Sequence, residues 1–195
     1  MSGLNKAEIR VGTLNQENVI GAALFGDLTA QVPTMTNMLV TDGYIGMGYM
    51  PEDGFAVAVG QTATGIKEHN LGVVRMIDNG DEKSISLTLM QTNADNMAIM
   101  LGDDHVESEP SNGTHGNRVK AGFGHWTGKE GRLQVLLKDG DAYGVWCIPV
   151  SQVAEVSEVE VNATGVMGWQ IKFTAMDNPD GDDLYLITDD GIVSA

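Results

Sequence analysis

Apolar and polar residues alternate with a period of two along much of the chain, a pattern typical of strands with one buried face. The clearest case is the segment 84–89, where Ile85, Leu87 and Leu89 fall on the same face. Similar patterns predict short strands over residues 44–50, 55–59, 71–77, 119–126, 132–138, 142–150, 153–161, 166–176 and 184–188. About ten short strands predict a mainly β protein, built as a β-sandwich or a β-barrel.

Turn-forming residues separate these predicted strands. Residues 51–54, Pro-Glu-Asp-Gly, lie between the segments 44–50 and 55–59 and predict a hairpin there. The Asp-Asn-Gly-Asp string at 78–81 predicts a turn immediately before the strand 84–89. Further turns are expected at 138–141 and 177–181.

One short helix is predicted over residues 93–102. Asn93 is a favourable N-cap, and Gly102 is a favourable C-terminal stop. Met97, Met100 and Leu101 follow the i, i+3, i+4 spacing of a single helical stripe. The helix is therefore expected to flank the sheet and to pack these three side chains against it.

Three segments have no clear period. Residues 1–40 are expected to form an extended N-terminal arm that needs a partner surface, and a fraying terminus is the alternative. Residues 60–71 predict a long polar loop between strands, and residues 103–118 predict a second loop or insertion. Because 195 residues suffice for one well-packed core, residues 41–195 are expected to form a single domain.

The charge balance is strongly acidic. Asp and Glu number 27 and Lys and Arg number 11, which gives a net charge of −16. Nucleic-acid affinity depends mainly on clustered cations that release counterions from phosphates, so this balance opposes DNA binding. An acidic surface would instead repel DNA that slides past it, although acidity that serves only solubility remains the alternative.

The histidines do not form a recognisable metal signature. His69, His105, His115 and His125 lack the paired i, i+4 spacing with an adjacent Glu. His105 and His115 fall in the same polar loop and are the best candidates for a metal site, but nothing nearby in the sequence supports them. We therefore expect no metal and no catalytic site.

Other chemistry-bearing patterns are also incomplete. The Asp-rich stretches 78–82 and 177–183 lack the ligand order of an EF-hand, and the Gly-rich stretch 43–48 lacks the lysine of a P-loop. Cys147 is the single cysteine and lies in an apolar run, so a buried, inert thiol is expected. With these motifs incomplete, we expect no cofactor. The sequence shows neither a signal peptide nor an apolar stretch long enough for a membrane span, so we expect synthesis in the cytosol.

Several strings, taken in their order along the chain, resemble the major tail (tube) proteins of lambda-type, long non-contractile-tailed bacteriophages (siphophages). The most specific is 86–102, where Gln91, Thr92 and Asn93 lead from a strand into a short helix closed by Gly. The others are Val-Pro-Thr at 32–34, Gly-Tyr-Met-Pro-Glu-Asp-Gly-Phe at 48–55, Ile-Lys at 66–67 with Val-Val-Arg at 73–75, and the late segments 148–153 and 165–175. Gln91 replaces a usual Glu, and the region of His69 replaces a common aromatic residue.

The resemblance implies a structural virion protein with a β-sandwich or barrel of the tail-tube type. Such proteins self-assemble into stacked hexameric rings that form an acidic channel for genome delivery. The implied partners are other copies of the chain, the tape-measure protein, the tail terminator and the tail-tip initiator proteins, with non-adhesive passage of DNA. The implied assembly contacts are Val32, Pro33, Glu52, Asp53, Gln61, Thr62, Thr64, Ile66, Lys67 and His69.

Two other functions remain open at this stage. The first is another phage structural ring protein, namely a tail terminator, a head-tail connector or a capsid decoration protein. The second is a small β-barrel metal-binding protein that uses His105, His115 and His125 near the acidic loop.

Overall fold

The structure is a computed structural model that describes residues 22–68, 72–157, 159 and 167–192. In this part of the chain the protein is mainly β with one short α-helix, as the sequence predicts. The elements in chain order are β1 (Ala23–Gly26), β2 (Tyr44–Gly46), β3 (Phe55–Glu68), β4 (Gly72–Leu89), α1 (Ala94–Leu101), the 3-10 helix η2 (Asp103–His105), β5 (Val106–Glu109), β6 (Arg118–Ala121), β7 (Glu130–Asp139), β8 (Ala142–Val156), β9 (Trp169–Ala175) and β10 (Tyr185–Asp189).

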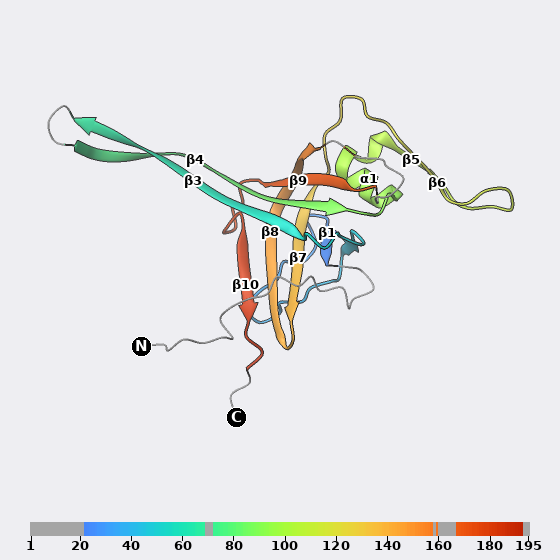
Figure 1. Cartoon of the computed structure of the whole chain (residues 1–195), viewed down its shortest axis with the longest axis horizontal. Helices are drawn as coiled ribbons and strands as arrows, with labels where there is room; N and C mark the ends of the chain where they lie inside the picture. The colour runs from blue at the N-terminus through green and yellow to red at the C-terminus, as the bar shows by residue number, and fades with distance from the viewer. Residues whose placement is uncertain (1–21, 69–71, 158, 160–166, 193–195) are drawn as a thin grey trace.

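Eight strands form one antiparallel sheet in the order β2-β1-β7-β8-β9-β4-β3, with β10 paired to β8. The long strand β8 belongs to both halves of this sheet, because its first part pairs with β7 and β10 and its last part pairs with β9. Register shifts between Gly131 and Leu133 and between Val153 and Glu155 mark the bend. As Figure 1 shows, β4 and β9 run across β7 and β10, so the sheet folds over itself as an open β-sandwich with crossed layers.

The main core lies between these layers and beneath α1. Ile85, Leu87 and Leu89 on β4 are buried, which confirms the predicted period-two strand. The side chains in the same core come from β1, β7, β8, β9 and α1. They include Phe25, Leu133, Ile148, Ile171, Phe173, Met97, Met100 and Leu101.

The helix begins and ends as its sequence predicts. The Asn93 side chain accepts a hydrogen bond from the Asn96 backbone N–H at 2.8 Å, and Gly102 ends the helix with φ 89°. The buried Asn96 side chain also donates to the carbonyl groups of Met47 at 3.0 Å and Gln91 at 2.8 Å. These bonds attach the start of α1 to the segments that flank the sheet.

A second, smaller core covers the opposite face of β1, β7 and β8. It contains Leu24, Val40, Tyr44, Leu136 and Val145. The connection between β1 and β2 closes over it, because the Tyr44 hydroxyl donates to the carbonyl of residue 31 and the Tyr185 hydroxyl donates to the carbonyl of residue 33, both at 2.9 Å. Burial raises the pKa of Tyr44 to about 12, so its hydroxyl remains a donor.

The structure corrects the prediction of an extended arm over residues 1–40 for the second half of that segment. Ala23–Gly26 is a fully buried strand between β2 and β7, and residues 27–40 belong to the body. The side chains of the apolar run Ala22 to Phe25 are buried, and leaving them exposed to water on an arm would cost free energy. Residues 1–21 lie outside the described residues.

The prediction that residues 44–50 and 55–59 pair with each other as a hairpin is wrong. The turn itself forms, since the Gly54 N–H donates to the Pro51 carbonyl at 3.1 Å. However, β2 pairs with β1, with Ile45 opposite Phe25, whereas β3 pairs with β4. The buried strand β1 supplies a better partner for β2 than its neighbour in sequence, and no local turn signal reveals this.

The loop expected over residues 60–71 and the turn expected at 78–81 are also wrong. Residues 60–68 lie inside β3 and residues 78–81 lie inside β4, and the two strands pair as one long two-stranded ribbon. Residues 69–71 lie outside the described residues. Paired backbones satisfy each other's hydrogen bonds even where the side chains show no apolar period, and register shifts after residues 61 and 66 absorb the irregular sequence.

The remaining differences concern strand limits. The segment expected as a loop at 103–118 contains η2 and most of a hairpin made of β5 and β6, which pair only with each other. The segment 142–150 and the first part of the segment 153–161 form one strand, β8, which ends at Val156; residues 158, 160 and 161 lie outside the described residues. The strand expected over 119–126 ends at Ala121. The turn at 138–141 is confirmed, with Gly140 at φ 61°.

Candidate assembly interface

The ribbon formed by β3 and β4 is the most unusual feature of the described structure. Near the body β4 is also paired with β9, over Ser84 to Leu89. Beyond that point β3 and β4 pair only with each other, and Figure 1 shows them extending far from the sandwich. An isolated two-stranded hairpin is marginally stable in water. A ribbon of this length is therefore expected to need a further contact surface.

Exposed apolar side chains lie on both faces of the ribbon. Ile66 and Ile77 are 44% and 43% exposed on one face, and Val73 and Met76 are 52% and 59% exposed on the other. Val74, at the bulge between the pairs Ile66/Arg75 and Lys67/Val73, is 55% exposed. Exposed apolar side chains gathered in one projecting segment are typical of interaction surfaces.

Gly65 allows one face of the ribbon to close up. A Cβ atom at this position would lie 2.9 Å from a methyl of Val73 and 3.4 Å from the sulfur of Met76. The two apolar side chains therefore cover the glycine and form a compact protrusion. Lys67 lies beside them, opposite Val73 in the register.

The ribbon is fixed to the body at its base by two ion pairs. Lys83 donates to Asp183 at 2.9 Å, and Lys172 on β9 donates to Glu82. The hydrogen bond from Lys83, followed by that from the Asn178 N–H, lowers the pKa of Asp183 below its ordinary value. Both pairs lie where β4 leaves the body, so they restrict the direction in which the ribbon projects.

A second projection is the β5–β6 hairpin. His115 at its tip contacts Glu109 at 3.1 Å and Asn112 at 2.8 Å, and Lys120 pairs with Glu107 at 2.9 Å. At its base Phe123 stacks on Trp169 with ring centroids 5.8 Å apart. The tip and the base of this hairpin are thus held by contacts within the chain.

The predicted contact residues fall into three groups. Gln61, Thr62, Thr64, Ile66 and Lys67 lie on β3 within the ribbon, and the side chains of the last three are exposed. The structure thus brings this group together.

The other predicted contacts lie elsewhere. Glu52 and Asp53 are exposed in the turn before β3, at the opposite end of that strand. Val32 and Pro33 lie on the body, where Pro33 is buried. His69 lies outside the described residues.

The sequence interpretation missed the β4 side of the ribbon. Val73, Val74, Met76 and Ile77 were expected to form an ordinary strand, yet they are exposed. The sequence signal that could have revealed this exposure is the apolar run Val-Val-Arg-Met-Ile at 73–77, which follows the polar segment 60–71 closely in the chain.

No metal-binding cluster is found in the described residues. They contain no group of three or more His, Cys, Asp or Glu side chains placed to hold a metal ion. His105 and His125 line a polar pocket of about 390 Å³, whereas His115 lies at the tip of the β5–β6 hairpin. Burial raises the pKa of Cys147 to about 11, which keeps the thiol protonated and unreactive.

An open β-sandwich that extends a long, two-sided apolar ribbon defines a protein built to associate with other protein surfaces. The chain matches the family model described as phage tail tube protein over residues 3–195 and belongs to that family. No curated protein matches it. The family is structural rather than enzymatic, so the protein is a tail component of a phage particle, and the resemblance to phage tail tube proteins is confirmed. No helix among the described residues is long and apolar enough to cross a membrane.

Proposed function

We propose that the protein self-assembles into hexameric rings that stack into the tube of a long, non-contractile phage tail, through which the genome is delivered. The observation that carries the proposal is the ribbon of β3 and β4. Five exposed apolar side chains, Ile66, Val73, Val74, Met76 and Ile77, lie on both faces of its part farthest from the body. Covering this surface on a neighbouring copy removes the apolar area from water, which is a driving force for assembly.

Unpaired strand edges support the same proposal. Within the described residues the sheet ends at β2 on one side and at β3 on the other, and β10 has β8 as its single partner. Open edges promote pairing with other chains unless they are protected. Ring formation would use these edges in a controlled way, and closed symmetry would limit the growth of each ring.

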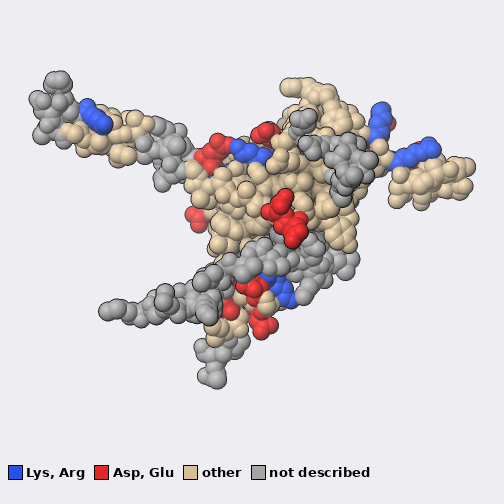
Figure 2. All heavy atoms as spheres, in the orientation of Figure 1, with Lys and Arg blue, Asp and Glu red and all other residues tan. Residues whose placement is uncertain are grey.

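The charge distribution fits a channel for DNA. The acidic excess gives a net charge of −16, and Figure 2 shows Asp and Glu distributed over the body while Lys and Arg appear mainly on the two projections and near their bases. DNA gains no counterion release from an acidic wall. The tape-measure protein, the tail terminator and the tip initiator are the other components that such a tube requires.

The test removes the ribbon without touching the body. Gly60 lies opposite Glu82 in the register, so residues 61–81 are replaced by an Asn-Gly turn that closes the shortened hairpin. Negative-stain electron microscopy should show tubes for the wild type and folded, unassembled subunits for the variant.

A matched control shortens the other hairpin. Residues 110–117 at the tip of β5 and β6 are replaced by the same turn, and assembly should persist. Tubes of normal length from the protein without its ribbon would refute the proposal.

A further inference from the structure

We propose that the ribbon of one copy docks in an apolar groove on β7, β8 and β10 of another copy, with Val73 and Met76 entering the groove. This inference rests on the proposed function, because it names the surface that receives the ribbon in the assembled tube.

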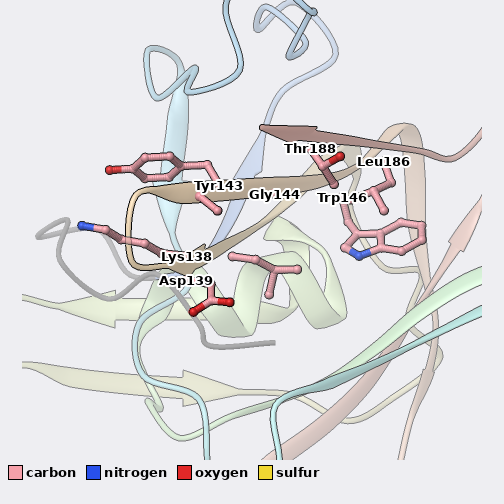
Figure 3. A pocket seen from close by; sticks show the side chains of 9 residues that line it. Lys138, Asp139, Tyr143, Gly144, Trp146, Leu186 and Thr188 are labelled. Carbon is pink, nitrogen blue, oxygen red and sulfur yellow. The ribbon is translucent and has the colours of Figure 1, made fainter. Parts of the chain in front are cut away.

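The groove lies at the end of the β7–β8 hairpin, beside β10, and has a volume of about 220 Å³. Figure 3 shows Tyr143 and Trp146 on opposite sides of it, with Leu186 and Thr188 contributed by β10. Leu186 is 43% exposed. Apart from the rim, the lining is almost entirely apolar.

The strand register explains why this face is hollow. Leu137, Gly144 and Thr188 lie opposite one another on β7, β8 and β10, and the next row contains Trp146 and Leu186. The central position of the first row is a glycine, so the floor of the groove is backbone between larger side chains. An aliphatic side chain from another molecule can occupy the space that the glycine leaves.

The groove is out of reach of the ribbon of the same copy. In Figure 1 the ribbon projects sideways from the upper part of the body, whereas the β7–β8 turn and the end of β10 lie at the lower end. The ion pairs Lys83–Asp183 and Lys172–Glu82 hold the base of the ribbon in this direction. A ribbon that enters the groove must therefore come from a second copy.

Charge complementarity favours the pairing. Residues 64–77 contain Lys67 and Arg75 and a single acid, which makes the ribbon end a basic region of a strongly acidic chain. The groove is lined by one cation, Lys138, and one carboxylate, Asp139. Three further acids, Asp141, Asp189 and Asp190, lie at the adjoining ends of β8 and β10, so carboxylates outnumber cations around the rim. Attraction between these regions would orient the ribbon as its apolar side chains enter.

The face with Val73 and Met76 fits the groove better than the opposite face. Gly65 lets these two side chains pack together as one protrusion, and Lys67 beside them can reach the acidic rim. An apolar protrusion with a neighbouring cation matches an apolar hollow with neighbouring carboxylates.

Cross-linking between copies tests the inference. Met76→Cys and Leu186→Cys are combined in one chain, and assembled tubes are treated with a short bismaleimide. The native Cys147 is fully buried and does not compete. We expect a ladder of covalent oligomers on a denaturing gel. The control combines Met76→Cys with Val119→Cys on β6, also exposed, and should give no ladder.

The outcomes separate the two proposals. Wild-type protein that forms no tubes contradicts the proposed function itself. Tubes in which Met76→Cys fails to link to Leu186→Cys, or links equally to Val119→Cys, overturn the groove assignment alone.

A second measurement covers the case in which the double variant does not assemble. Leu186→Cys alone is incorporated into tubes with excess wild-type protein and is treated with a maleimide dye. Strong protection in tubes and rapid labelling in free subunits support the inference. Equal labelling in both states overturns it, and so does protection that is already present in the free subunit, because the groove would then be covered within one copy.

Discussion

Replacing Val73 and Met76 together by Ser is expected to weaken tube assembly without unfolding the subunit. Both side chains lie on one face of the ribbon and are 52% and 59% exposed. Full burial of one Val or Met side chain contributes about 1.5–3 kcal/mol, so burying the exposed halves of both on assembly is worth about 2–3 kcal/mol per subunit. Losing this contribution should raise the critical concentration for tube formation by about 30- to 150-fold.

The assay compares sedimentation with thermal unfolding. Pelleting of tubes across a dilution series gives the critical concentration, and circular dichroism of free subunits gives the stability of the fold. Because these positions are exposed in the subunit, its stability should change by about 0.5 kcal/mol or less. Val119→Ser on β6 is the matched control and should change neither quantity. An unchanged critical concentration in the double variant would refute the reasoning, and a large loss of subunit stability would show that the ribbon packs on its own body.

Four further outcomes follow from the same structure. Asn93→Ala removes the cap of α1 and should cost about 1 kcal/mol, measured by denaturant unfolding of the free subunit; no loss would mean that the helix does not depend on its cap. Gly102→Ala adds a Cβ to a residue with φ 89°, and this Cβ would lie 2.8 Å from the Thr127 carbonyl oxygen. The substitution should destabilise the subunit by about 1–2 kcal/mol, and an unchanged stability would contradict the positive φ at this position. The hydrogen bond from Lys83 lowers the pKa of Asp183 in the folded state. The ionised carboxylate therefore stabilises the fold above the ordinary carboxyl pKa, and this contribution is lost as the pH falls through the lowered pKa. The difference in unfolding free energy between wild type and Asp183→Asn should narrow in acid, and a difference that widens would contradict this reasoning. Burial raises the pKa of the Cys147 thiol to about 11, so native subunits should resist N-ethylmaleimide at neutral pH until denatured, and rapid labelling of the native state would contradict the buried position.

Local signals in the sequence predict the secondary structure of the body well. The alternation of Ile85, Leu87 and Leu89 and the cap at Asn93 are each determined by residues adjacent in the chain. Their physical causes, one buried face and one unsatisfied helix end, act over a few residues. The mainly β fold with one flanking helix follows from them.

Strand pairing and the ribbon depend on contacts between distant residues, and for this reason the sequence did not predict them. The strand β2 lies beside β1 because Phe25 and its neighbours need a covered sheet, not because of the turn at Gly54. Where its side chains are described, at residues 64–67 and 72–77, the ribbon has no buried face in a single subunit, so no apolar period marks residues 60–68 as strand. If its apolar side chains are buried against another copy, contacts between copies, and not contacts within one subunit, stabilise the ribbon.

One strand of the candidate interface was expected from the sequence, and its role in assembly stays a prediction. The segment from Gln61 to Lys67 was identified through the resemblance to tube proteins, and it does form one edge of the ribbon. The opposite strand was missed, because the exposure of Val73 and Met76 is visible only once the ribbon is seen to leave the body. The groove beside Gly144 was missed for a similar reason, since three strands far apart in sequence form it.

A helical reconstruction of the assembled tube by cryo-electron microscopy tests the central claim most directly. The account predicts stacked rings of six copies in which each β3–β4 ribbon crosses to a neighbouring copy and its apolar side chains are covered. Tubes in which the ribbons project into solvent, or particles with no repeating rings, would contradict it.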